Sequence, residues 1–252
     1  MKRLTALSSL FFVCVGLVGV VADVDTDAAS RVQSPVLPYR DVDSLVVIRG
    51  EPSWPSLADL FDFRKGVEGL ASIEAIRPGG AYQLEVSEPR PFFVGRVTEG
   101  WFDQMGQPFA AGAPWARGAK GDVVVGATMA RSMFGDAATA LGKTLAVQRV
   151  AGPNAAPTRE EIRIAGVLAA DAVLPFPATI DIFVPYEPGA NELLARGSRA
   201  VLIIGRLRDH TQFDATAQQV SAVARTLAET HPRNKGTSAR LVSLRDELNT
   251  KP

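Results

Sequence analysis

The sequence predicts an α+β protein, and three observations lead to this fold class. Short runs of β-branched residues recur along the chain between prolines and glycines, which is the pattern of strands joined by turns. Residues 213–230 carry apolar side chains at helical spacing. Strand patterns stand on both sides of that helix, so the last third of the chain predicts a βαβ-type unit.

Composition indicates a globular protein and argues against nucleic acid as a partner. Of the 252 residues, 46% are hydrophobic and 21% charged, which is ordinary for a folded chain of one large or two small domains. Lys plus Arg and Asp plus Glu both number 27, so the formal net charge is zero. Nucleic-acid binding normally needs a basic excess that neutralises phosphates. No basic run is longer than the two residues of Lys2-Arg3, which is too short to supply one.

The N-terminus predicts export. Lys2-Arg3 precede the uncharged segment 4–21, and three aspartates follow it from Asp23. This charge order places the N-terminus in the cytoplasm and the remainder outside. Residues 1–22 are either a signal peptide, cleaved after Ala22, or a single transmembrane helix, for which about 17 to 25 residues are needed. The other apolar runs, 123–125 and 200–204, are too short to cross a bilayer.

Cys14 is the only cysteine, and it lies within the hydrophobic segment. The rest of the chain therefore forms neither a disulfide nor a thiolate metal site. A lipoprotein anchor at Cys14 is a third interpretation of the N-terminus, but the bulky pair Phe12-Val13 does not suit it.

The first half of the chain predicts a linker, then strands around one helix. Residues 23–44 are acidic and polar with two prolines, as in a linker, and 45–48 is a buried strand. Ser56 is placed to cap a helix that continues to Arg64. The next three predicted strands, separated by Pro-Gly-Gly and Glu-Pro turns, are 73–76, 82–86 and 92–97.

The second half alternates between glycine-rich loops and short elements. Residues 106–121 read as a loop anchored by Trp115, and Gly135 ends a helix over 128–134 that follows a strand at 123–125. We expect 145–147 and 162–167 to pair, with 152–161 as their hairpin tip. The remaining predicted elements are strands 181–185, 200–206 and 239–244 and the helix 213–230, which ends at His231-Pro232.

No group of residues predicts catalysis, a cofactor or a metal. His210 and His231 are the only histidines, and both lie in turn-like segments without clustered ligands. The glycine-flanked segment 112–118 lacks the strand–loop–helix context of a phosphate site. We therefore expect a protein that is not an enzyme, with no catalytic, cofactor-binding or metal-binding residues.

The remaining candidates are structural residues. The carboxylate pairs Glu160-Glu161 and Asp246-Glu247 are expected on solvated faces. Core packing is favoured over a soft binding surface for Met129 and Met133, which lie four residues apart, and for Phe134 beside them. The same holds for the aromatic residues Trp101, Phe102 and Phe109.

The order of these segments resembles the MacB-like periplasmic core domain of ABC-transporter permeases. Residues 97–106 resemble the family's "V-s-x-x-[YF]-F-x-x-[LM]-G" turn, while Ala113 departs from the "G-R-x-F" that follows it. The other similar segments, which extend the match over residues 37–247, are 37–48, 122–145, 164–167, 181–185, 205–208 and 230–232. Each motif is short, so the resemblance depends on their common order and spacing.

The resemblance implies a two-part periplasmic domain. Residues 45–105 plus 197–247 would form an α/β subdomain, and 106–196 a mostly β subdomain inserted into it. Such a domain couples permease movement to partner proteins in efflux or export, without bond chemistry. The family continues into further transmembrane helices, whereas this chain stops at Pro252. We therefore expect it to assemble with separate permease and ATPase subunits, or to be a stand-alone derivative.

The expected location is the inner membrane, through residues 4–21, with the bulk of the chain in the periplasm. The alternative is a soluble periplasmic protein that acts as a ligand-binding module for a small hydrophobic or peptide ligand. An exported hydrolase with an unrecognised site is the least favoured hypothesis.

Overall fold

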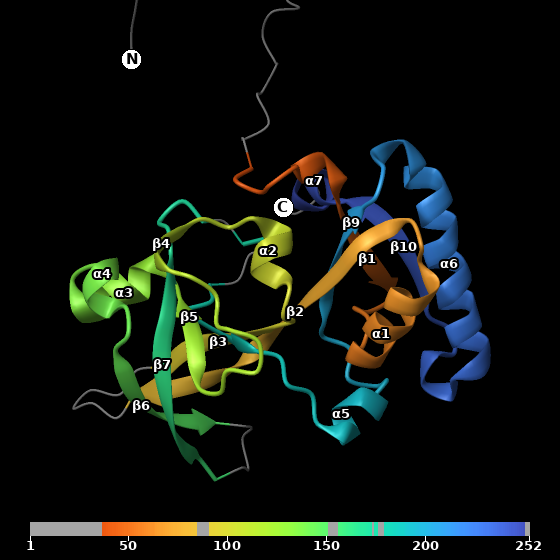
Figure 1. Cartoon of the computed structure of the whole chain (residues 1–252). Helices are drawn as coiled ribbons and strands as arrows, with labels where there is room; N and C mark the ends of the chain where they lie inside the picture. The colour runs from red at the N-terminus through yellow and green to blue at the C-terminus, as the bar shows by residue number, and fades with distance from the viewer. Residues whose placement is uncertain (1–36, 85–90, 151–155, 173, 176–178, 250–252) are drawn as a thin grey trace, which may run out of the picture. The chain divides into compact units, whose positions relative to one another are not determined.

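The computed structural model describes residues 37–84, 91–150, 156–172, 174–175 and 179–249 (Figure 1). The hydrophobic segment 4–21, Cys14 and the linker up to residue 36 lie outside the described residues. From Leu37 onwards the chain forms one compact unit. Within the described ranges, no helix is long and apolar enough to cross a membrane.

The predicted α+β class is confirmed. The α-helices and 3-10 helices, the latter labelled η, are η2 (Val42–Ser44), α1 (Leu57–Gly66), α2 (Trp101–Met105), α3 (Ala127–Phe134), α4 (Ala137–Ala140), α5 (Ala190–Leu194), η3 (His210–Gln212), α6 (Phe213–Thr230), η4 (Pro232–Asn234) and α7 (Leu244–Asn249). The strands are β1 (Leu45–Glu51), β2 (Leu70–Leu84), β3 (Pro91–Val97), β4 (Phe109–Gly112), β5 (Asp122–Val125), β6 (Thr144–Val150), β7 (Thr158–Leu168), β8 (Ile182–Pro185), β9 (Leu202–Leu207) and β10 (Ser238–Ser243).

All ten strands belong to one sheet that closes on itself at one end. The order is β10-β1-β9-β2-β3-β8-β5-β7-β4, and β6 pairs with both β2 and β7. Because β6 joins these two strands, six strands close into a ring, in the order β2-β3-β8-β5-β7-β6. We call this the six-strand ring. The strands β10, β1 and β9 extend from it as an open sheet (Figure 1).

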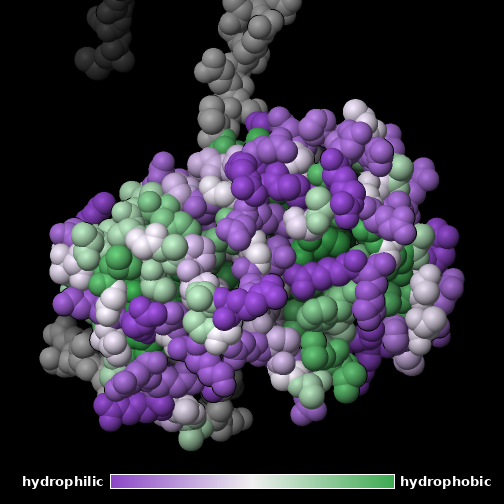
Figure 2. Space-filling model, viewed as in Figure 1, coloured by the Kyte–Doolittle hydropathy of each residue, from purple (hydrophilic) through white to green (hydrophobic). Residues whose placement is uncertain are grey.

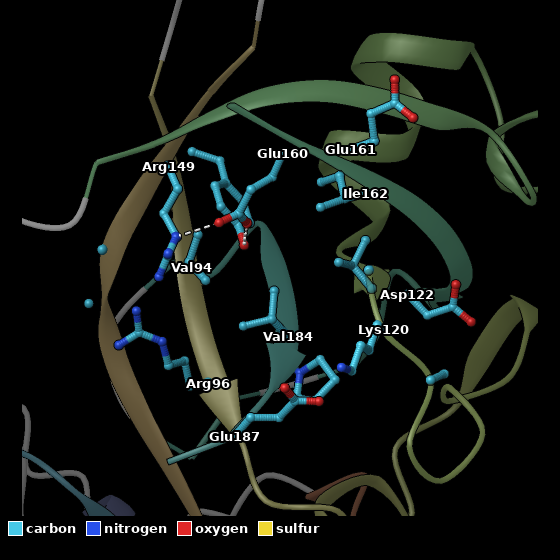
Figure 3. Close-up of a pocket in the computed structure, with 17 residues that line it drawn as sticks. Val94, Arg96, Lys120, Asp122, Arg149, Glu160, Glu161, Ile162, Val184 and Glu187 are labelled. Atoms are coloured by element: carbon cyan, nitrogen blue, oxygen red, sulfur yellow. Dashed lines mark hydrogen bonds and ion pairs between the residues drawn. The ribbon is translucent and has the colours of Figure 1, made fainter. Parts of the chain in front are cut away.

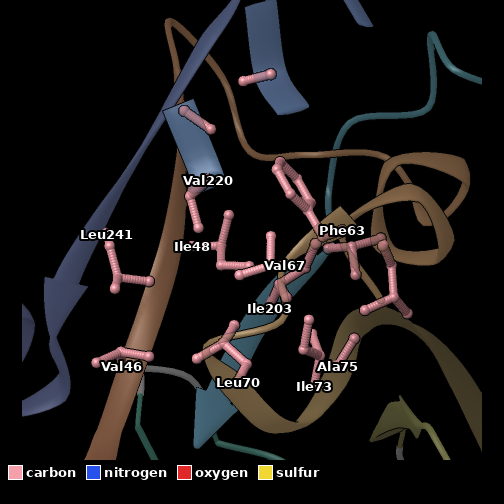
Figure 4. Packing of buried hydrophobic residues seen from close by; sticks show 14 of the residues in the cluster. Val46, Ile48, Phe63, Val67, Leu70, Ile73, Ala75, Ile203, Val220 and Leu241 are labelled. Carbon is pink, nitrogen blue, oxygen red and sulfur yellow. The ribbon is translucent and has the colours of Figure 1, made fainter. Parts of the chain in front are cut away.

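Two helices cover one face of the open sheet. Ser56 accepts a hydrogen bond from the backbone N–H of Asp59 and so begins α1, as predicted. The helix α6 has the predicted bounds and presents Val220 to the same core. Figure 4 shows this core, where Ile48 and Ile203 of the sheet meet Phe63 of α1. Burying each such side chain stabilises the fold by about 1.5 to 3 kcal/mol.

The predicted βαβ-type unit is present with one strand inserted. Both β9 and β10 pair antiparallel with β1, which lies between them. They therefore run parallel to each other and are connected through α6, so the crossover spans β1.

Aromatic residues fill the core on the opposite face of the open sheet, as predicted. Trp101 and Phe102 of α2 are buried there. The Phe102 ring makes edge contacts, with centroids 5.5 to 5.6 Å away, to the three rings of Phe109, Trp115 and Phe183. Outside these cores the visible surface is mostly hydrophilic, and apolar side chains gather over α1 and α5 (Figure 2).

The third core fills the six-strand ring. Val123, Ile162 and Ile182 point inward from three of its strands, and Met129 joins them from α3. Met129 is 1% exposed and Met133 packs against the same cluster, so the prediction that these methionines are core residues is confirmed.

Two strands that the sequence predicts separately belong to a single strand, β2. We expected 73–76 and 82–86 to be separated by a turn at Pro78-Gly79-Gly80, but β2 runs through this position as a bulge. Gly79 and Gly80 have φ of 128° and 94°, which glycine adopts without strain, so the chain bends without ending the strand. Residues 85–90 are not described, so the end of the second predicted strand stays untested.

Other differences involve short elements. The segment 106–121 is not wholly a loop, because β4 pairs with β7 at the edge of the sheet. The strand β7 begins at Thr158, so the hairpin tip is shorter than the expected 152–161. The helices α2, α4, α5 and α7 were missed, since four to six residues are too few to show helical periodicity.

The division into subdomains at 45–105 plus 197–247 and 106–196 remains a prediction. The strands β2 and β3 belong to the first part, yet β2 pairs with β6 and β3 pairs with β8 in the second. The two proposed parts therefore share one continuous pair of strands.

We expect Gly80→Ala to lower the free energy of unfolding by roughly 1 to 2 kcal/mol, because a Cβ atom disfavours its positive φ. No heavy atom lies within 4 Å of that Cβ position, so the loss would report backbone strain alone. Gly197→Ala is the matched control, since a Cβ atom at Gly197 also meets open space while its φ lies outside the left-handed region. Chemical denaturation measures both variants, and equal losses would contradict the assignment.

Candidate functional site

Two places on the molecule have the features of a functional site. The first is a junction where residues 37–44, which we call the strap, meet α2, β9 and α7. The second is a cavity at one end of the six-strand ring. The sequence singled out neither.

The strap lies against the C-terminal end of α2. The backbone N–H of Arg40 donates to the carbonyl of Met105 at 3.1 Å, and the Arg40 guanidinium donates to the carbonyl of Asp103 at 2.8 Å. Asp41 has φ of 47°, the only positive value at a non-glycine residue in the described ranges. Such a conformation costs free energy and persists where surrounding contacts hold it.

Arg206 of β9 supplies those contacts. Its side chain is 14% exposed and donates to the carbonyls of Arg40 at 2.8 Å and Gln104 at 2.5 Å. It also donates to the carbonyl of Asp41 at 3.2 Å and to the hydroxyl of Ser44. One guanidinium therefore joins the strap, α2 and the sheet. Burial first, and the nearby Arg40 charge second, lower the pKa of Arg206, while Asp41 opposes this shift.

The last described helix is fixed to the same place. Asp43 of the strap accepts from Arg245 of α7 at 2.9 Å. Glu247 of α7, whose side chain is 3% exposed, accepts from Arg49 of β1 at 2.5 Å. The first and last described segments of the chain thus lie side by side (Figure 1).

The cavity at the end of the six-strand ring has a volume of about 350 Å³. Its walls come from β2, β3, β6, β7 and β8 and from the loop before β5 (Figure 3). Val94, Ile162 and Val184 form an apolar floor that continues into the ring core. Gly79 and Gly80 of the β2 bulge contribute no side chains, which leaves this side of the cavity open.

Polar side chains line the cavity above that floor. Glu160 forms an ion pair with Arg149 at 2.6 Å and accepts a hydrogen bond from the Tyr82 hydroxyl at 3.3 Å. Burial first, and the Glu160 charge second, raise the pKa of Tyr82 to about 12, so its hydroxyl stays protonated and remains a donor. Arg96 and Lys120 also reach into the cavity (Figure 3).

The two carboxylate pairs differ from the expectation that both are solvated. Glu160 is half-buried in the ring, because alternation along β7 directs it inward with Ile162 while Glu161 is exposed. Glu247 is buried because α7 turns it towards β1. Arg49 is distant from Glu247 in the sequence, whereas Arg149 reaches Glu160 across the β6–β7 hairpin, whose register the sequence pattern did not determine.

The histidines are not brought together. His210 precedes α6 and is exposed, whereas His231 ends that helix. Eighteen helical residues place them roughly 27 Å apart. In the described part of the chain, no three His, Cys, Asp or Glu residues form a group that could hold a metal ion. Segment 112–118 begins at the end of β4 and precedes no described helix directly.

Solved domains of a permease, of MacB and of an ABC-type transporter have a similar fold. A domain of a protein described as a permease, from Porphyromonas gingivalis, has 15% sequence identity and a TM-score of 0.61, covering 81% of this chain and 91% of that one. The periplasmic region of MacB from Actinobacillus actinomycetemcomitans has 14% identity and a TM-score of 0.55, with coverages of 83% and 94%. The extracellular domain of the noncanonic ABC-type transporter YknZ, from Gram-positive bacteria, has 17% identity and a TM-score of 0.50, with coverages of 77% and 98%.

The sequence itself identifies the family. The family model described as MacB-like periplasmic core domain matches residues 11–223, so the chain belongs to this family. The predicted resemblance is thereby confirmed. No curated protein sequence matches the chain closely enough to count as a relative.

We expect Arg206→Met to lower the free energy of unfolding by roughly 2 to 3 kcal/mol, since carbonyl groups of the strap and α2 lose a charged donor whose own side chain is 14% exposed. In this variant, the backbone amide hydrogen of Arg40 should exchange faster than the amide hydrogens of the strands. Arg240→Met is the control: Arg240 and its partner Glu51 are about half exposed, at 54% and 51%, and such pairs contribute about 0 to 1 kcal/mol. Equal losses in both variants would show that the junction is not specially stabilised.

Proposed function

We propose that this chain is the extracytoplasmic domain of an ABC-transporter permease assembly and that it performs no bond chemistry. In this role it couples movement of membrane-embedded subunits to envelope proteins or to extracted cargo. Family membership supports the transporter context. The coupling role rests on the junction described above.

The observation that carries the proposal is the joint fixation of the strap and α7. Arg206 ties the strap to β9, and Asp43 and Glu247 tie α7 to the strap and to β1. A domain that receives motion from the membrane needs its entering and leaving segments fixed to a rigid element. Strands packed between buried cores provide that rigidity, because close-packed interiors transmit displacement instead of absorbing it.

The same proposal gives a location. Residues 4–21 would hold the chain in the inner membrane, with the folded domain in the periplasm. The membrane-embedded and ATPase parts of an ABC transporter would be its partners. The second candidate is a soluble periplasmic binding module, which the cavity of the six-strand ring favours because cavities of about 300 to 1,000 Å³ accommodate small ligands.

Membrane fractionation of the natively expressed protein separates these two candidates. We expect the chain to remain in the membrane pellet after carbonate washing, with an intact mass that includes residues 1–22. A soluble protein that begins at Asp23 would contradict the anchored assembly and would favour the binding module.

A further inference from the structure

The inward-facing charges of the six-strand ring do not balance. Phe92 and Val94 of β3 point into the ring core, so the alternation of the strand directs Arg96 inward as well. By the same alternation, the side chains of Arg149 on β6 and Glu160 on β7 also point into the ring. Two guanidinium groups therefore share one carboxylate, and Arg149 pairs with it.

Arg96 is the cation that has no carboxylate partner among the described residues. It is half-buried, and no hydrogen bond or ion pair joins it to any part of the chain that the structure describes. Its cross-strand neighbour Arg77 is already engaged, because its guanidinium contacts Glu192 at 2.5 Å. A guanidinium that has lost part of its hydration is stabilised by an anion that accepts two parallel hydrogen bonds.

The rest of the cavity lining carries one cation, that of Lys120, and three carboxylates. Lys120 and Glu187 stand on the loops at its rim and have opposite signs (Figure 3). Asp122 belongs to the lining, but its carboxylate accepts from Arg163 at 2.5 Å. Glu161 also lines the cavity, but it is exposed and alternates along β7 with the inward-facing Glu160 and Ile162. Among the described side chains that point into the ring, the unbalanced charge is therefore that of Arg96.

Beneath Arg96 the lining is apolar. Val94, Ile162 and Val184 face the cavity, and Val123 continues the surface into the core. The volume of about 350 Å³ lies at the small end of the range for ligand sites. At the far end of β5, Met129 and Ala130 of α3 fill the ring. A ligand would thus enter from the Arg96 end only.

We propose that this cavity binds a small amphipathic anion, with a carboxylate or phosphate group on Arg96 and a short apolar body on the valine and isoleucine floor. This site is independent of the transporter assembly, because all of its residues belong to this chain. Its ligand would add a binding activity to the coupling role proposed above.

Calorimetric titration of the full chain in nanodiscs, with empty nanodiscs subtracted, tests the site. We expect saturable binding of octanoate or octyl phosphate, and the tighter of the two identifies the anionic group. Octylamine, which has the same chain but a positive charge, should bind at least tenfold more weakly. Inorganic phosphate alone should also bind more weakly, since it leaves the apolar floor uncovered.

Three variants connect binding to the charge imbalance. Arg96→Gln should weaken octanoate binding about tenfold or more, because it removes the bidentate donor. Glu160→Gln should strengthen binding, because it frees Arg149 as a second cation, and a merely unfolded protein could not give this result. Arg131→Gln is the matched control: Arg131 is exposed on α3, at the far end of the ring. Unsaturable binding, or equal affinities in Arg96→Gln and the control, would overturn the proposal.

Discussion

The pairing of β2 with β3 is the constraint on which the rest of the molecule depends. The first half of β2 pairs with β9 of the open sheet, and its second half pairs with β6 of the six-strand ring. The strand β3 pairs with β2 on both sides of the bulge, and its other edge pairs with β8. If this pair of strands separated, the ring would open, and β2 would keep only its pairings with β9 and β6. The positive φ angles of Gly79 and Gly80 allow the strand to serve both parts.

The same strands connect the two candidate sites. Arg206, which holds the strap, lies on β9 directly opposite Ser72 of β2. Eight residues beyond Ser72 along β2, Gly80 borders the cavity into which Arg96 reaches. One strand, β2, therefore connects the region of the strap with the end of the ring. Coupling and ligand binding would act on one rigid element, so each can influence the other without a separate hinge.

Local patterns predicted much of the fold. The helix at 213–230 and the strand–helix pair near 123–134 were correct, because periodicity and the terminating Gly135 are encoded in adjacent residues. Closure of the ring was not foreseen, since the pairing of β6 with β2 joins distant segments. Neither site was foreseen either. Arg206 and Arg96 look like ordinary strand arginines until tertiary contacts, or their absence, single them out. The alternation from Phe92 to Arg96 was the one available signal.

The central claim, that this domain works within a transporter assembly, is tested most directly by cross-linking in intact cells of the native host. The tagged chain would be purified from the cross-linked membranes, and its partners identified by mass spectrometry. We expect a permease subunit and an ABC-type ATPase in fixed ratio to the chain, with cross-links that map to the strap and α7. Recovery of the chain without either subunit, at a native expression level, would contradict the assignment.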